Sequence, residues 1–386
     1  MMKRDDVVFF RTRKLESLDF LSNSPPQVFI GSKLYPRANV GILSPSEPLK
    51  QVQLLHSPDE WTEMGLTIKQ ILNLRNQLIN SRFQVNSIKE STKFLDRSRE
   101  VGMAYKPTDL EIHLKKTPTY QKENDKITIP INLIAPLKNF KIIENPKIPR
   151  KVDKVVEDTD LKAKDALMYL YKNNFNEHFL QQLLSIGVIG LKKNRKLVPT
   201  RWSITATDDI IGKELLKDVK NYPTIDDYKL FYDKYLGNQY FILLLPTLFN
   251  YELFEYGLKY GKIKGEWTDS EDYFGRKEYA SNSVGGYYSV RLSVLEYLEK
   301  IKRQAAVFII RYETEEYWAN LGVWVTRNCS KRAMNKNYIS FYSRENALDF
   351  MKEFIFNKLK QDITNVFKRS KLINFIKEQK GLREFF

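Results

Sequence analysis

The densest group of chemically active side chains lies between residues 195 and 209, in the string RKLVPTRWSITATDD. Guanidinium, ammonium and hydroxyl groups in one short segment suit a phosphate, because arginine offers a planar fork of donors and hydroxyls complete the oxygen shell. The tryptophan among them could stack on a base. We therefore predict a phosphate- or nucleotide-binding segment that comprises Lys196, Thr200, Arg201, Trp202, Ser203 and Thr205.

Two adjacent acids, Asp208 and Asp209, close this segment. They could hold a divalent cation through oxygen ligands. Alternatively, one of them could cap a helix that starts near Ile210, since aspartate is common at helix starts. The sequence of this segment therefore does not decide whether it binds a nucleotide, a divalent cation or no ligand.

Further polar groups later in the chain could join the same pocket. Arg276 lies in DSEDYFGRKEYA and Arg291 in GGYYSVRLSVLEYL, while Arg303 precedes the apolar run AAVFII and Arg311 and Glu313 follow it. The arginines are candidate phosphate ligands, and Glu313 is a third candidate acid. The alternative is ordinary ion pairing with no catalytic role. No Walker loop, nucleophile elbow or dinucleotide glycine fingerprint occurs, so the sequence names no reaction.

The final residues, QKGLREFF, carry Gln379, Leu382, Phe385 and Phe386. In one tight 3₁₀-like turn, residues three apart lie on the same side, so Leu382 and Phe385 can form a single apolar plug with Phe386 beside it. A few apolar anchors of this kind supply most of the energy when a peptide docks into a preformed pocket. The alternative is that the plug packs onto its own domain.

Composition limits the classes of protein that could carry these groups. The chain has 63 Lys and Arg against 47 Asp and Glu, a net charge of +16, which favours a polyanionic partner such as DNA. The stretch from residue 331 to 386 holds 13 basic and six acidic residues, so the excess is pronounced there. A single cysteine and three histidines exclude a cysteine-based zinc site and fit a cytoplasmic protein. We expect neither a secretory leader nor a membrane span, because the longest apolar run is about half of the ~20 residues that a span needs.

The elements that position these side chains change along the chain. Twelve of the 15 prolines precede residue 150, which predicts extended segments and turns, with one helix from Ser57 to Leu78. Two strands, AAVFIIRYE and LGVWVTRN, interrupt an otherwise helical remainder. We therefore predict a mixed α+β fold: a proline-rich extended N-terminal third over a largely helical body with a few buried strands and a helical C-terminal end. The expected regions are 1–150 (proline-rich), 151–342 (central, helix-rich), 343–378 (basic amphipathic helices) and 379–386 (peptide).

Several strings carry a resemblance to a known family. PPQVFIGSKLYPRANVGILSP, ENPKIPRKVDKVVEDTDLKA and LLSIGVIGLKKNRKLVPTRWSITATDD, among others from about Ser24 to Met334, resemble the archaeal Nre DNA repair proteins. The resemblance implies a role in DNA damage tolerance and binding to the PCNA sliding clamp, because Gln379, Leu382, Phe385 and Phe386 match the clamp-binding element (PIP motif) residue by residue. Some relatives carry a cysteine-rich segment near the start, which this chain lacks, so no zinc site is carried over.

Three functions remain open at this point. The first is a clamp-tethered repair factor that binds DNA or a nucleotide through a basic polar pocket. The second is a nucleotide- or metal-dependent enzyme, such as a nuclease, phosphohydrolase or nucleotide transferase. The third is an interaction platform whose polar cluster is structural. The first two hypotheses need the scattered arginines and acids to share one pocket, whereas the third does not.

Overall fold

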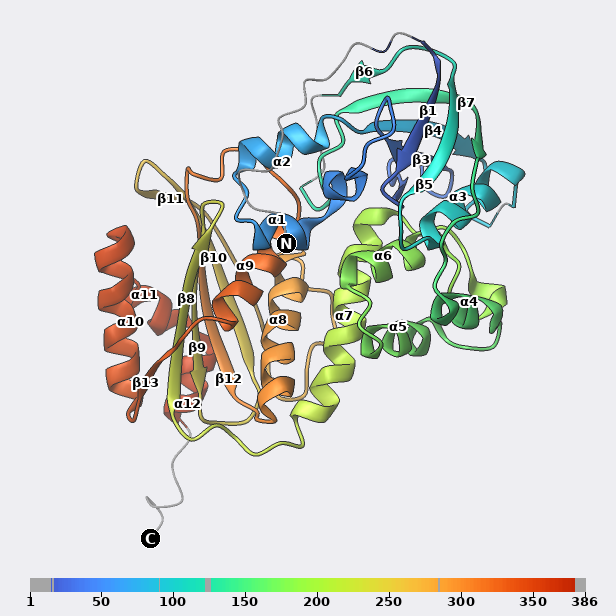
Figure 1. The fold of residues 1–386 in the computed structure, drawn as a ribbon. Helices are drawn as coiled ribbons and strands as arrows, with labels where there is room; N and C mark the ends of the chain where they lie inside the picture. The colour runs from blue at the N-terminus through green and yellow to red at the C-terminus, as the bar shows by residue number, and fades with distance from the viewer. Residues whose placement is uncertain (1–14, 16, 90, 122–125, 284, 379–386) are drawn as a thin grey trace. The chain divides into compact units, whose positions relative to one another are not determined.

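The computed structural model describes residues 15, 17–89, 91–121, 126–283 and 285–378. The chain folds into two compact units (Figure 1). Unit 1 comprises Met1–Ile211 and Asn320–Trp324, and unit 2 comprises Gly212–Ala319 and Val325–Phe386. The compositional boundary expected at residue 150 therefore lies inside unit 1.

Unit 1 is built on one mixed sheet with the hydrogen-bonded order β1-β5-β7-β4-β3-β2, and β6 pairs with β7. The strands are β1 (Asp19–Ser24), β2 (Val28–Ile30), β3 (Ala38–Ser44), β4 (Ile79–Val85), β5 (Thr108–Leu114), β6 (Thr119–Tyr120) and β7 (Leu133–Ile142). Alternation of buried and half-buried residues in TDLEIHL of β5 shows how one face of each strand supplies the core. Strand β7, which contains Pro136, lies inside this sheet between β4 and β5.

The helix predicted from Ser57 to Leu78 is two helices, α1 (Pro58–Glu63) and α2 (Ile68–Arg75). Pro58 opens the first turn as expected. The chain then bends at Gly65, whose φ of 63° is left-handed, and Thr67 starts the second helix in a capping box with Gln70. Two helices follow residue 160, in the region that we expected to be helical: α5 (Ala163–Lys172) and α6 (Glu177–Ser185). Unit 1 also contains α3 (Lys93–Met103), α4 (Arg150–Glu157) and the first part of α7 (Thr200–Val219), whose residues from Gly212 onward belong to unit 2.

Unit 2 contains a second mixed sheet, with the strand order β11-β10-β12-β9-β8-β13. The strands are β8 (Tyr228–Tyr235), β9 (Asn238–Leu245), β10 (Tyr251–Lys259), β11 (Lys262–Glu271), β12 (Ala306–Glu313) and β13 (Ile339–Phe341). Helix α8 (Gly286–Ile301) connects β11 to β12, and β12 inserts between β9 and β10, parallel to β10 and antiparallel to β9. The central position of β12 brings residues far apart in sequence onto adjacent strands.

The expectation of a largely helical body with a few buried strands is wrong. The described part of the chain contains two multi-stranded sheets as well as helices, and β8 to β11 occupy the region that we expected to be helical. Two tight turns explain the difference: Leu236 and Gly237, and then Tyr260 and Gly261, all have positive φ, as two-residue hairpin loops require. The string LGVWVTRN, predicted as a strand, instead lies mostly in α9 (Trp324–Met334).

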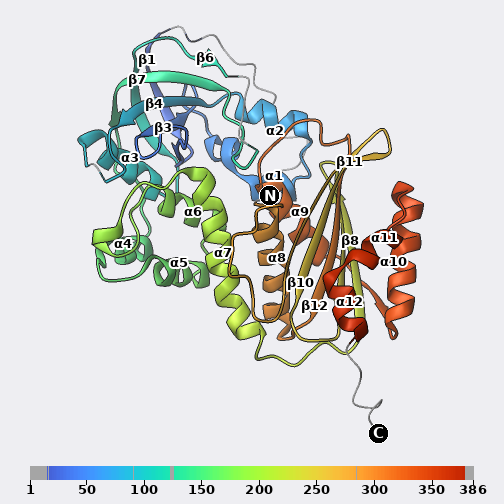
Figure 2. The same cartoon turned by 180° about the vertical axis from the view of Figure 1, so that it is seen from behind.

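One face of the unit 2 sheet is apolar and carries the hydrophobic core. Phe241, Phe254 and Phe308 point to this face, where α10 (Arg344–Leu359), α11 (Thr364–Arg369) and α12 (Lys371–Glu378) cover them. Figures 1 and 2 show these three helices on one side of the sheet and α8 and α9 on the other. The predicted amphipathic helices between residues 343 and 378 are therefore confirmed, and their apolar residues close the core.

A buried glutamate fixes the last of these helices. The carboxylate of Glu252, on β10, accepts hydrogen bonds from the backbone N–H groups of Lys371 at 2.9 Å and Leu372 at 3.2 Å, and from the hydroxyl of Ser370. It thus serves the free N–H groups and the positive end of α12. Burial raises the pKa of Glu252, although these hydrogen bonds act to lower it.

Replacing Glu252 by alanine should destabilise unit 2 by about 1–3 kcal/mol, because the first turn of α12 loses its acceptor in a buried place. Urea unfolding measures the change. Glu252→Gln, which keeps one acceptor oxygen, should lose less. Because burial raises the pKa of Glu252 in the folded protein, the contribution of Glu252 to the free energy of unfolding should fall as pH rises through that pKa. The Glu252→Gln variant should lack this pH dependence. Equal stability of all three proteins would contradict this role.

Candidate functional site

The second face of the unit 2 sheet carries polar side chains under α8 and α9. Strand residues alternate between faces, so Asn238 and Tyr240 of β9, Glu255 of β10, and Arg311 and Glu313 of β12 share the face opposite the apolar core. Register places Tyr240 and Glu255 directly on either side of Arg311, and Asn238 directly beside Glu313. We call these five residues the polar face.

Arg311 is the centre of the polar face. Its Nη1 lies 2.5 Å from Oε1 of Glu255, its Nη2 lies 3.2 Å from Oε2 of Glu313, and its Nε donates to Oδ1 of Asn238 at 2.9 Å. Burial raises the pKa of Glu255, and the positive charge of Arg311 opposes that rise. The guanidinium therefore holds one buried and one half-exposed carboxylate in fixed positions.

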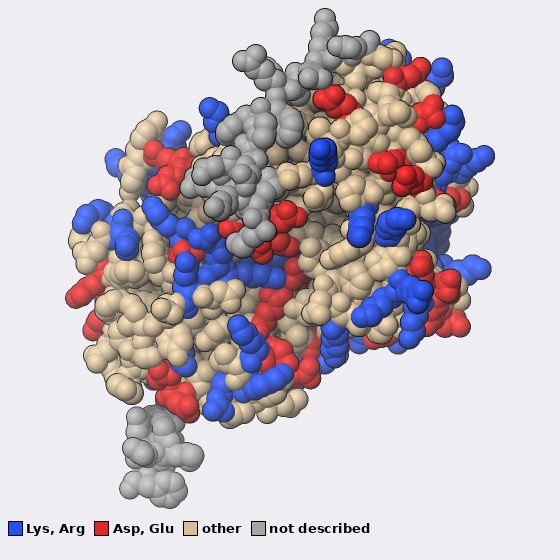
Figure 3. Space-filling view, in the orientation of Figure 1, with Lys and Arg blue, Asp and Glu red and all other residues tan. Residues whose placement is uncertain are grey.

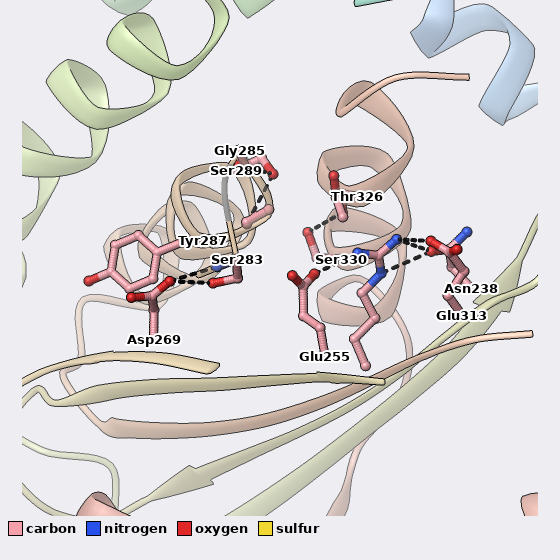
Figure 4. Close-up of polar contacts among 12 residues, drawn as sticks. Asn238, Glu255, Asp269, Ser283, Gly285, Tyr287, Ser289, Glu313, Thr326 and Ser330 are labelled. Atoms are coloured by element: carbon pink, nitrogen blue, oxygen red, sulfur yellow. Dashed lines mark hydrogen bonds and ion pairs between the residues drawn. The ribbon is translucent and has the colours of Figure 1, made fainter. Parts of the chain in front are cut away.

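Two more ion pairs extend this arrangement toward β11. Asp269 accepts from the backbone N–H and the hydroxyl of Ser283, both at 2.8 Å, and its other oxygen lies 3.1 Å from Nη1 of Arg276. Glu271 pairs with Nε of Arg291 at 2.5 Å, and both side chains are buried. Figure 4 shows Asp269 and Glu255 pointing from the sheet toward the helices.

Helix α8 approaches the carboxylate of Glu255 closely at its first residue. A side chain on Gly286 would place Cβ 2.8 Å from Oε1 of Glu255, so a larger residue would push this buried, paired carboxylate from its position. The N-terminal end of a 16-residue helix therefore faces this carboxylate, which favours its charged form. On α9, the hydroxyl of Ser330 donates to carbonyl oxygens of its own helix and contacts Ser293 of α8 at 2.8 Å, so the two helices are joined by hydroxyl groups.

Tyr240 contributes a buried hydroxyl to the polar face. Burial raises the pKa of Tyr240 well above its ordinary value, and among the described residues this hydroxyl has no hydrogen-bond partner. Nearby, Cys329 is buried, and burial raises its pKa to about 12, so its thiol stays protonated near neutral pH.

The segment predicted from residues 195 to 209 lies in unit 1, and most of its hydroxyls serve the backbone. The hydroxyl of Thr200 accepts from the N–H of Ile30 at 2.9 Å, while Ser203 and Thr205 donate to carbonyls of their own helix. Trp202 is partly exposed and packs edge-on against Tyr35. Lys196 precedes α7 and is exposed. Arg201 lies in the first turn of α7 and is half-buried.

The capping role considered for Asp208 or Asp209 is wrong. Helix α7 begins at Thr200, so both aspartates lie well inside it, and the helix does not start near Ile210. The cause is Pro199, whose carbonyl accepts the first helical hydrogen bonds from Trp202 and Ser203. Asp208 is buried and lies 3.5 Å from the amide of Gln181.

The remaining predicted residues separate into two groups. The structure brings Arg276, Arg291, Arg311 and Glu313 to the same side of the unit 2 sheet. Arg303 does not join them, because it precedes β12 and lies eight residues from Arg311, roughly 26 Å along an extended strand. Gln379, Leu382, Phe385 and Phe386 lie outside the described residues. Among the residues that the structure describes, no three His, Cys, Asp or Glu side chains gather as a metal site, and no helix has the length and apolar character to cross a membrane.

Sequence reasoning missed Asn238, Tyr240 and Glu271, which complete the polar face and its flanking pair. A signal existed in β10, whose string YELFEYG places Glu252 and Glu255 an odd number of positions apart, on opposite faces of a strand. The strand register that joins β9 to β12 has no such signal, since it depends on the crossover through α8.

Comparisons with known proteins match nearly the whole chain. The profile described as "Archaeal Nre, N-terminal" matches residues 2–261, and the profile described as "Archaeal Nre, C-terminal" matches residues 271–385. DNA repair protein NreA of Archaeoglobus fulgidus is 35% identical over 91% of this chain and 88% of its own length. NreA of Haloferax volcanii is 33% identical over 80% of this chain and 76% of its own length. NreB of Archaeoglobus fulgidus, also named a DNA repair protein, is 35% identical over 86% of this chain and 84% of its own length. No solved structure matches the chain.

Proposed function

We propose that this chain, which belongs to the archaeal Nre family, is a cytoplasmic DNA repair factor that docks on the PCNA sliding clamp through residues 379–386. The clamp holds it beside DNA, which its body contacts. The relatives named as DNA repair proteins, aligned over most of the chain, support the general role.

The spacing of Gln379, Leu382, Phe385 and Phe386 carries the clamp-docking part of the proposal. These residues begin directly after α12, which ends at Glu378. Glu252 holds the first turn of α12 on the sheet, so the peptide starts from a fixed point on unit 2. An aliphatic and two aromatic anchors with one amide then supply the few strong contacts that peptide docking needs.

A synthetic peptide of residues 377–386 should displace the full chain from the cognate clamp in a competition assay. A peptide with alanine at Phe385 and Phe386 is the matched control and should not compete. Displacement by neither peptide would contradict docking through this segment.

The charge of the chain supports the contact with DNA. The net charge is +16, and Figure 3 shows Lys and Arg side chains gathered over α9, to which Lys331 and Arg332 belong. Tethering strengthens a weak contact, because the clamp can raise the effective concentration of its partner toward ~1 mM. DNA affinity measured against salt concentration tests the contact: several phosphate contacts give a steep dependence, whereas a flat one would contradict them.

An enzyme acting on nucleotides or nucleic acid is the second proposal. The observation that favours it is Glu255, a buried carboxyl with a raised pKa beside Arg311. A carboxyl group whose pKa is raised can act as a proton donor or acceptor nearer to neutral pH. Nucleotides and divalent cations should then raise the melting temperature of the wild type but not of Glu255→Gln. If the nucleotides stayed chemically unaltered and the melting temperature did not change, the enzyme proposal would be contradicted and the non-enzymatic repair factor would be favoured.

A further inference from the structure

A half-exposed tryptophan lies over two glycines at one edge of the polar face. Trp267 of β11 pairs directly with Glu255 of β10, so it is on the same face. A Cβ atom on Gly265 would lie 2.4 Å from Cη2 of the indole, and one on Gly257 would lie 3.8 Å from Cζ3. The six-membered ring therefore rests on a floor of two paired glycines, of which Gly265 leaves no room for a side chain.

This arrangement differs from a core tryptophan. The indole packs on the glycine floor, yet 46% of Trp267 remains exposed. An aromatic ring that is positioned by packing and still accessible is the usual platform on which proteins stack a base. The close approach accounts for glycine at position 265, where a side chain would displace the ring, whereas a Cβ atom at position 257 would make ordinary van der Waals contact with it.

A carboxylate lies one strand away from this platform. Glu313 is directly opposite Gly257 in the β10–β12 register, at a strand spacing of about 4.8 Å. One of its oxygens contacts Arg311, and 43% of its side chain is exposed. Arg311 is already engaged with Glu255, Asn238 and Glu313. The group available to a base stacked on Trp267 is therefore the carboxylate of Glu313, a hydrogen-bond acceptor, which suits the amino group of a base.

The tip of the same hairpin is basic. Lys259, Lys262 and Lys264 are all exposed, within six residues of one another and a few residues from Trp267. Lysines beside a stacking ring are the combination that binds single-stranded nucleic acid, because the charges follow the phosphates while the ring takes a base.

We propose that Trp267 stacks on an unpaired nucleobase that presents an amino group to Glu313, with the lysines of the hairpin tip on the adjacent phosphates. The inference rests on the proposed contact with DNA and adds the part of the nucleic acid that is recognised. The substrate class is a single-stranded segment with an accessible adenine, cytosine or guanine.

The test uses the full chain and a single strand of about 12 nucleotides with one central 2-aminopurine, whose fluorescence is quenched on stacking. Trp267→Leu should weaken binding roughly 5- to 150-fold and abolish the quenching. Trp267→Phe, which also removes the indole but keeps an aromatic face, should retain most of the affinity. Phe274→Leu, at a position 89% exposed in the following loop, is the matched surface control and should bind like wild type.

Two further variants test the polar parts of the site. Glu313→Gln should reduce the preference for an oligocytidine over an oligothymidine strand, because thymine offers no amino group. Alanine at Lys259, Lys262 and Lys264 together should lower the salt slope of binding by about 2. Absence of any single-strand binding by the wild type would overturn the proposed DNA contact. Wild-type binding that Trp267→Leu leaves unchanged would overturn this inference alone.

Discussion

Replacing Arg311 by methionine should destabilise unit 2 by about 3–5 kcal/mol, because it leaves the buried carboxylate of Glu255 without its partner. The effect should exceed that of other single substitutions on the polar face, since Arg311 also orients Asn238 and Glu313. Urea unfolding followed by tryptophan fluorescence measures it. Arg303→Met, at the other end of β12 and outside this cluster, is the matched control and should change stability by less than about 1 kcal/mol.

The pH dependence of the Arg311→Met variant follows from Glu255. Burial already raises the pKa of Glu255, and Arg311 opposes that rise, so removal of Arg311 should raise the pKa further. An acid whose folded pKa is raised contributes most at low pH and loses stability as pH rises through that pKa. The deficit should therefore be smaller at about pH 5 than at about pH 8. Adding Glu255→Gln should restore part of the stability, and a deficit independent of pH and of Glu255 would contradict the pairing.

Alanine at both Phe385 and Phe386 should reduce the affinity for the sliding clamp roughly 100-fold or more, because each aromatic is an anchor whose loss costs about 2 kcal/mol or more. The melting temperature should stay nearly unchanged, since both substitutions fall beyond the end of α12 and the proposal places these side chains on the clamp. Calorimetric titration of the clamp gives the affinity, and a thermal scan gives the stability.

Phe375→Ala is the matched control for the tail variant. Phe375 lies on α12 and is half-exposed, so its removal takes one phenylalanine from the region just before the peptide. This variant should bind the clamp like the wild type. If the tail variant bound the clamp normally while Phe375→Ala did not, the docking surface would be α12 rather than the terminal peptide.

The local elements of the fold were predictable from sequence where their signals are local. Pro58 at a helix start, the amphipathic pattern through Leu348 and Met351, and the run that became β12 all follow from spacing and composition. The hairpins from β8 to β11 were missed because their turns, at Leu236-Gly237 and Tyr260-Gly261, lack the asparagine or aspartate that usually marks such loops.

The error at LGVWVTRN has a different physical cause. Val323, Trp324 and Val325 are all buried, so this stretch presents apolar residues on every side. A short apolar run of this kind does not distinguish a buried helix from a buried strand, and tertiary packing decides. Trp324 packs edge-on against Trp61, far earlier in the chain, and that contact is not visible in the local sequence.

The candidate site was predictable in its residue types but not in its assembly. Arg276, Arg291, Arg311 and Glu313 stood out as charged groups near apolar runs, and they share one side of the unit 2 sheet. Asn238 and Glu255, the partners of Arg311, come from β9 and β10, which β12 separates. Only the crossover through α8 brings them together, and no spacing in the sequence encodes that register.

Hydrogen–deuterium exchange of the full chain, with and without the cognate sliding clamp, tests the central claim most directly. The account predicts that the clamp slows exchange in the peptide that contains residues 379–386 and leaves the strands of both sheets as they were. Unchanged exchange in that peptide when the clamp is bound would contradict recruitment through the terminal segment.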